Sequence, residues 1–171
     1  PRQQHVAALG ARIEWVPMGY MSHLVHRAKA IARERGVTYL PPGVDIPEAE
    51  GVFVANLREV WDDLQRFIFT PDEVWCAMSS SMLARCIAQA MPQVIVHAVA
   101  VGLKSAWSAK RLPDNLVVHE YPKPFEVEVK VDAPFPIDVN YEAKAWAWML
   151  THDGRRRRRG QRALFWNVIG K

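Results

Sequence analysis

The spacing of hydrophobic and polar positions changes most clearly near the middle of the chain. Val74–Met78 is an apolar run of strand length, and three serines follow it. Met82–Met91 then repeats its apolar residues at helical spacing and stops at Pro92. A second apolar run, Val94–Val101, ends at Gly102. This order predicts a strand, a turn, a helix and a second strand, with the helix crossing over to a parallel neighbour.

The remaining segments continue the alternation of helices and strands. Helical spacing occurs in Pro1–Leu9, Ser22–Arg35, Pro47–Phe67 and Tyr141–Leu150. Strands are predicted over Ala11–Val16, Val37–Leu40, Leu116–His119 and Ala163–Ile169, with an edge strand or extended arm over Pro122–Pro136. We therefore expect an α/β fold, a mainly parallel sheet with helices on both faces, in one domain over residues 1–171. Its Rossmann-like core should cover about residues 1–120, followed by the arm, a helix and a last strand.

Loops at the carboxyl ends of strands are the expected ligand-binding region of such a sheet. Three loops are predicted to meet on that rim, Pro17–Met21, Pro41–Asp45 and Ser79–Ser81. The serine loop precedes a helix, whose free N–H groups and positive dipole end favour an anion. A simple N-cap of that helix is an equally good interpretation of the serines. Asp45, after Gly43, is likewise suited either to orient a ligand or to cap the next helix.

Composition narrows the class of protein. Half of the 171 residues are apolar, which suits a globular domain rather than a disordered chain. No apolar run reaches the length of a membrane span and no secretion signal is present, so we expect a cytoplasmic protein with no membrane partner. Cys76 and Cys86 are predicted to be buried free thiols. They fit no metal-site spacing, and no metal site is predicted.

Much of the positive charge, a formal net +4, comes from one run of arginines. The run consists of Arg155, Arg156, Arg157, Arg158 and Arg159. Clustered arginines pair with phosphates and bind nucleic acid in a salt-dependent way. No recognised nucleic-acid-binding motif accompanies them, so a solvated turn at a helix C-terminus is the simpler interpretation. Contact with nucleic acid is the alternative hypothesis.

Several segments resemble the pyridoxal-phosphate enzymes of fold type II, the group of tryptophan synthase β, cysteine synthase and aminocyclopropane-carboxylate deaminase. Ala8–Ile13 resembles their A-L-G-A-E-V stretch, and Leu40–Pro47 is similar to the segment before a later helix. Val74–Ala84 resembles the strand and G-S-G-T loop that hold the cofactor phosphate. Homologues encoded by bacteriophages and some bacteria, described as pyridoxal-phosphate-dependent or phosphoribosyltransferase-like, are more similar still. They share the segments found here at Pro71–Cys76, Asn140–Trp146 and Leu164–Val168.

The resemblance implies a phosphate-bearing ligand, pyridoxal phosphate or another, at the predicted rim. The resemblance places Ser79, Ser80, Ser81 and Met82 at the ligand, and the position of the second predicted rim loop adds Gly43 and Asp45. Asn140, Tyr141 and Lys144 would close over the rim; the alternative is that Tyr141 packs on the core and Lys144 is solvated. The implied chemistry is that of a lyase or deaminase acting on a small amino acid.

Two departures from the family pattern affect this expectation. The family's Schiff-base lysine and its substrate-carboxylate loop precede the A-L-G-A stretch, so both are expected outside this chain's residues and no catalytic residue is assigned. Serines also replace the loop glycines, and serine adopts a positive φ only with strain.

We therefore expect the phosphate-binding portion of such an enzyme, completed by a second copy or a partner chain. One alternative is a non-catalytic module that binds a nucleotide or nucleic acid through the serine loop and the arginine run. The other is a phosphoribosyltransferase-like enzyme, although the acidic run that binds ribose hydroxyls is not found.

Overall fold

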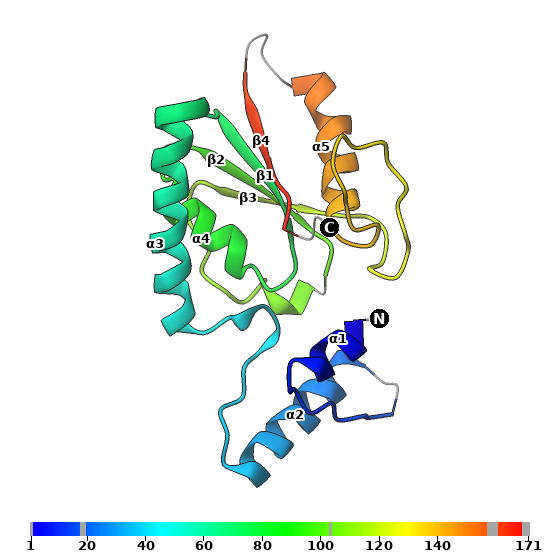
Figure 1. Ribbon diagram of the computed structural model, residues 1–171. Coiled ribbons are helices and arrows are strands. Elements are labelled where there is room, and N and C mark those ends of the chain that lie inside the picture. Colours follow the sequence, from blue (N-terminus) through cyan, green and yellow to red (C-terminus); the bar gives the residue numbers. More distant parts are fainter. Residues whose placement is uncertain (1, 18–19, 103, 157–160, 169–171) are drawn as a thin grey trace. The chain divides into compact units, whose positions relative to one another are not determined.

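The computed structural model describes residues 2–17, 20–102, 104–156 and 161–168 (Figure 1). The chain divides into two compact units, Pro1–Pro41 and Pro42–Lys171. The hydrophobic pattern placed no boundary at this point. The predicted ligand-binding residues all belong to the second unit.

The first unit contains two helices, α1 (Arg2–Ala8) and α2 (Met21–Arg35). Gly36 ends α2 in the left-handed conformation, with a φ of 64°. The predictions of strands over Ala11–Val16 and Val37–Leu40 are wrong: both segments are irregular, and most of their side chains are exposed. Among the described residues, no strand lies beside them to supply backbone hydrogen bonds, and alternation alone does not make a strand.

The second unit is built on a four-stranded sheet with the strand order β3-β2-β1-β4. The strands are β1 (Glu73–Met78), β2 (Ile95–Ala100), β3 (Leu116–Glu120) and β4 (Ala163–Trp166). Each neighbouring pair is parallel. The predicted parallel α/β fold is confirmed. The central strand β1 is buried over nearly its whole length, as expected for a strand that reads as a continuous apolar run.

Helices cover both faces of this sheet (Figure 1). α4 (Met82–Ala90) packs on one face and α3 (Pro47–Asp63) packs against α4, while α5 (Glu142–Arg156) packs on the other face. Successive residues of β1 alternate between the two sides: Val74 lies in the core with α3 and α4, and Trp75 packs with α5. The central strand therefore serves two separate cores.

Two segments differ from the simplest prediction. The helix expected over Pro47–Phe67 has a regular part that ends at Asp63 and continues as a wide turn, η2 (Leu64–Ile68), closed by a 2.9 Å bond from the N–H of Phe69 to the carbonyl of Leu64. Of the two predictions for Pro122–Pro136, the extended arm is the correct one, since no strand is present there. Its prolines lack the N–H donors that a strand ladder needs.

Both cysteines are buried free thiols, as predicted. Burial raises the pKa of Cys76 to about 12 and that of Cys86 to about 11, so neither forms a thiolate readily at neutral pH. Within the described ranges, no three His, Cys, Asp or Glu side chains are grouped so that they would hold a metal ion. The helices of those same ranges include none with an apolar stretch that would cross a bilayer.

Candidate functional site

The serine loop leaves the carboxyl end of β1 and enters α4, as the sequence predicted. Ser81, the residue before the helix, has a φ of 73° and a ψ of −7°, the left-handed region in which a serine is strained. The N–H of Met82 lies 3.5 Å from Ser80 Oγ, and the Met82 side chain is buried in the core. The loop thus keeps a backbone suited to glycine although serines form it.

Two glycines make room for the serine side chains. A Cβ added at Gly43 would overlap Ser80 Oγ, and one added at Gly102 would overlap Ser79 Oγ and lie 3.2 Å from Ser79 Cα. Gly43 also has a φ of 75°. The structure therefore brings the Gly43 segment to the serine loop. That segment is a short 3-10 turn, η1 (Pro42–Val44), and not a loop leaving a strand.

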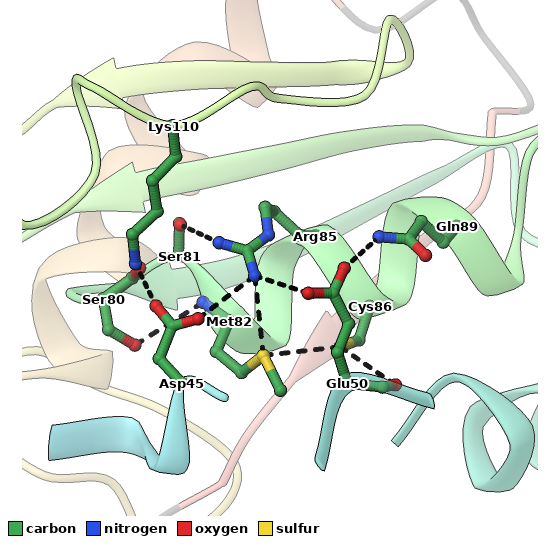
Figure 2. A network of polar contacts seen from close by, with 9 residues as sticks. All are labelled: Asp45, Glu50, Ser80, Ser81, Met82, Arg85, Cys86, Gln89 and Lys110. Atoms are coloured by element: carbon green, nitrogen blue, oxygen red, sulfur yellow. Dashed lines mark hydrogen bonds and ion pairs between the residues drawn. The ribbon is translucent and has the colours of Figure 1, made fainter. Parts of the chain in front are cut away.

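The side chain of Arg85 links the serine loop to two carboxylates (Figure 2). Arg85 lies in the first turn of α4, and its Nη1 donates to Ser81 Oγ at 3.2 Å. Its Nη2 donates to Asp45 Oδ1 at 3.1 Å and to Glu50 Oε2 at 2.8 Å. Only 10% of the Arg85 side chain is exposed, so these bonds satisfy a charge that would otherwise be costly to bury.

Lys110 completes the network from the opposite side (Figure 2). Its Nζ pairs with Asp45 Oδ2 and donates to the carbonyl of Ser80 at 2.6 Å. Asp45 is thus bonded to both cations, Arg85 and Lys110, whereas Glu50 contacts Arg85. The two carboxylates balance the two cations, so the network is neutral at pH 7.

The network controls the ionisation of both carboxyls. Burial by itself would raise the pKa of Asp45, but hydrogen bonds from Lys110 and Arg85 outweigh burial and lower it. The pKa of Glu50 is lowered by hydrogen bonds from Gln89 and from Arg85, against the effect of burial. Because these folded-state pKa values lie below the unfolded ones, the network stabilises the fold above the unfolded carboxyl pKa and is lost as the pH falls.

Tyr141, one of the three predicted rim residues, lies beside the serine loop. Its hydroxyl accepts a hydrogen bond from the backbone N–H of Ser79, which opposes the rise in pKa that burial causes at Tyr141. The phenol also packs with the residues of the core under α5. The two alternatives for Tyr141 are therefore combined in one side chain, which packs on the core and reaches the loop.

Lys144 and Asn140 bind the arm instead. Lys144 is 0% exposed, and its Nζ donates to the carbonyls of Pro124 and Phe125 at 2.7 and 2.8 Å. The amide of Asn140 also donates to the carbonyl of Phe125, at 3.2 Å. Lys144 is therefore buried and hydrogen-bonded, which differs from the expected solvated side chain.

The structure describes only the beginning of the arginine run. Arg155 and Arg156 are the last residues of α5, but their side chains lie outside the described residues. Arg157, Arg158 and Arg159 also lie outside the described residues. Contact of this run with nucleic acid stays a prediction.

The sequence analysis missed four residues of the site: Arg85, Lys110, Glu50 and Gly102. One of them had a usable signal, because Arg85 is the one charged residue among the apolar positions of Met82–Met91 and a charge on a buried face needs partners. Lys110 had none. Its contact with Asp45 joins residues 65 positions apart, and no local pattern reports such a pair.

The parallel sheet and the helices on both of its faces define an α/β protein, with the serine loop after its central strand. The same fold occurs in the crystal structure of an ACC deaminase homologue, with a TM-score of 0.64 and 14% sequence identity over 95% of this chain. The chain spans 59% of the length of that protein. No protein-family model and no curated protein matches the sequence. At this identity the similarity establishes the fold alone.

Substitutions of Ser81 test the left-handed conformation of the loop. Ser81→Gly and Ser81→Ala both lose the bond to Arg85, but only glycine removes the backbone strain, which is about 1 kcal/mol. We expect the free energy of unfolding of Ser81→Gly to exceed that of Ser81→Ala by about that amount, measured by urea denaturation. Equal stabilities would mean that residue 81 does not have a positive φ in solution.

Proposed function

We propose that this chain is the phosphate-binding portion of a pyridoxal-phosphate-dependent lyase or deaminase that acts on a small amino acid. The observation that carries the proposal is the serine loop. It lies at the carboxyl end of a central parallel strand, keeps a left-handed residue at Ser81 and leads into the nine-residue helix α4. The N–H groups at such a helix start favour a phosphate. The shared fold with the ACC deaminase homologue supports the same assignment.

The residues around the loop fit a phosphate ester. Gly43 and Gly102 are positions that a Cβ would fill, and they let neighbouring segments approach the loop closely. Arg85 and Lys110 supply positive charge, and the Tyr141 hydroxyl supplies a polar group at Ser79. Pyridoxal phosphate, when bound, supplies the electron sink for elimination or deamination. The residues of this chain bind the phosphate and set its orientation.

Binding of pyridoxal phosphate followed by borohydride reduction tests the proposal. We expect the purified chain to retain pyridoxal phosphate in equilibrium dialysis, and inorganic phosphate to compete with it, because the loop binds the phosphate group. Peptide mapping after reduction should show no fixation at Lys110 or Lys144, since Lys110 stays ion-paired, with Asp45 or with the bound phosphate, and the arm carbonyls hold the amine of Lys144. A chain that does not retain pyridoxal phosphate, at any concentration that leaves it soluble, would contradict the proposal.

A second candidate is a non-catalytic module that binds the phosphate of a nucleotide. The contacts of Lys110 and Lys144 favour it, because Lys110 pairs with Asp45 and Lys144 is held by two carbonyls. The reduction experiment separates the candidates when it is repeated with a partner chain or a longer form of the protein. Fixation of the cofactor to a lysine in that assembly supports the enzyme, and retention without fixation supports the module.

A further inference from the structure

Asp45 occupies a position at the serine loop that an anionic ligand would also occupy. Its carboxylate lies between the guanidinium of Arg85 and the ammonium of Lys110 (Figure 2). Each oxygen faces one of the two cations, and 14% of the Asp45 side chain is exposed. Two oxygens of a phosphate monoester would use the same two donors, since arginine and lysine bind phosphate and carboxylate alike. The bridging carboxylate therefore resembles a bound anion.

The turn that carries Lys110 also holds a buried polar group without a partner among the described residues. Trp107 is 8% exposed, and its indole N–H has no hydrogen-bond acceptor among the described residues. Trp107 and Lys110 belong to one turn, in which the Lys110 N–H donates to the Trp107 carbonyl at 3.0 Å. A buried donor without an acceptor is costly, so an acceptor supplied near this turn would be stabilising.

We propose, building on the function proposed above, that Asp45 is an internal counter-ion which the phosphate of the ligand displaces from Arg85 and Lys110. These two cations then bind the phosphate together with the serine loop. Glu50 stays bonded to Arg85 and keeps the guanidinium oriented toward the site. Binding is thus an exchange of one anion for another.

The turn before Asp45 holds backbone strain. Asp45 directly follows η1, where Gly43 and Val44 both have positive φ values of 75° and 50°. Valine is branched at Cβ and is strained in this region, so the turn loses strain when it leaves this conformation. α3 begins only at Pro47, so Asp45 moves away without unwinding that helix.

The exchange also sets the charge of the ligand. Asp45 already provides one negative charge to the two cations, so a ligand with a single negative charge gains little by replacing it. A phosphate monoester carries close to two negative charges at neutral pH and competes better. The site therefore selects a phosphate ester over a carboxylate of similar size, and pyridoxal phosphate over pyridoxal.

Substitution of Asp45 tests the exchange. Inorganic phosphate and pyridoxal phosphate are titrated into the wild-type chain, Asp45→Asn and Glu50→Gln, after circular dichroism has shown that each is folded. We expect Asp45→Asn to bind both probes at least about tenfold more tightly, because its two cations no longer have a competing anion. Glu50→Gln also removes one negative charge from beside Arg85, but it leaves Lys110 paired with Asp45. Its gain in affinity for the probes should therefore be smaller. In a Lys110→Met background, the gain in affinity from Asp45→Asn should be smaller, because only Arg85 is then freed.

Each outcome decides a separate point. If the wild-type chain binds pyridoxal phosphate and Asp45→Asn binds it equally or more weakly, the exchange is wrong and the proposed function stands. If neither protein binds either probe, both proposals fail. The carboxyl ¹³C resonance of Asp45 gives a readout in the wild-type chain that needs no variant. It should shift on addition of phosphate much more than that of Glu50, and an unchanged Asp45 resonance at saturating phosphate would rule out displacement.

Discussion

Replacement of Arg85 by alanine is expected to lower the free energy of unfolding of the second unit by about 3 kcal/mol at neutral pH. The side chains of its partners, Asp45 and Glu50, are only 14% and 28% exposed, so they lie in partly buried surroundings. Without Arg85 the network has two carboxylates and one cation, Lys110. Removing one partner of a buried ion pair leaves a charge that neither water nor protein compensates, and this costs more than the pair itself contributes.

The loss should depend on pH in a defined direction. The network lowers the pKa of both carboxyls in the folded wild-type chain, so its contribution is present above the unfolded carboxyl pKa of about 4 and is lost below it. In Arg85→Ala these carboxyls protonate more readily, which removes the uncompensated charge. The difference in stability between the two proteins should therefore narrow as the pH falls from about 7 toward about 4.

Urea denaturation at both pH values measures this difference. Lys104→Met is the matched control in the same unit, because it also breaks one cation–carboxylate pair. That pair, Lys104–Glu120, has side chains 65% and 57% exposed, and its loss should change stability by no more than about 0.5 kcal/mol. A difference for Arg85→Ala that does not change with pH would show that the cost comes from packing and not from charge.

Alanine at Gly102 and alanine at Gly51 are expected to have effects of opposite sign. A Cβ at Gly102 would overlap Ser79 Oγ and lie 3.0 Å from Ser79 Cβ and 3.2 Å from its Cα, so the backbone of the serine loop has to move. We expect Gly102→Ala to lower the free energy of unfolding by about 2 kcal/mol and to weaken phosphate binding. Gly51 lies inside α3 with no atom within 4 Å of an added Cβ, so Gly51→Ala should stabilise by about 0.5–1 kcal/mol.

The two glycine variants are compared by urea denaturation and by dialysis against inorganic phosphate. The chemical change is the same in both, so the difference between them reports the contact with Ser79 together with the helix propensity that alanine gains at position 51. Adding Ser79→Gly to Gly102→Ala should restore part of the lost stability, because the overlapping side chain is removed. If Gly102→Ala behaves like Gly51→Ala, the serine loop does not pack on Gly102.

The strands of the sheet could be predicted from the sequence where nearly every residue of a strand is buried. β1 is buried on both faces over nearly its whole length, and β2 over its last three residues, so almost every position is apolar, and this signal does not depend on knowing the neighbouring strand. Ala11–Val16 and Val37–Leu40 show the limit of the method. Their alternation resembles that of a half-buried strand, but whether a partner strand lies beside them is not written in the segment itself.

The candidate site also has one part that the sequence predicts and one part that it does not. The position of Ser79–Ser81 follows from a strand, a turn and a helix in sequence, and each of these is a local feature. The bonds of Arg85 to Asp45 and of Lys110 to Asp45 span 40 and 65 positions. The sequence therefore shows which side chains are charged. Only the folded structure shows which opposite charge neutralises each of them.

By itself, the sequence determined a parallel α/β unit and the place of the serine loop after its central strand, because hydrophobic spacing and the change from strand to helix are local properties. The tertiary structure alone decided that Asp45, Arg85 and Lys110 form a neutral network at that loop, that glycines at positions 43 and 102 make room for its serines, and that Lys144 is buried in the arm. The physical reason is that charge pairing and steric fit act between atoms brought together from distant segments, and only the packing of those segments sets their distances.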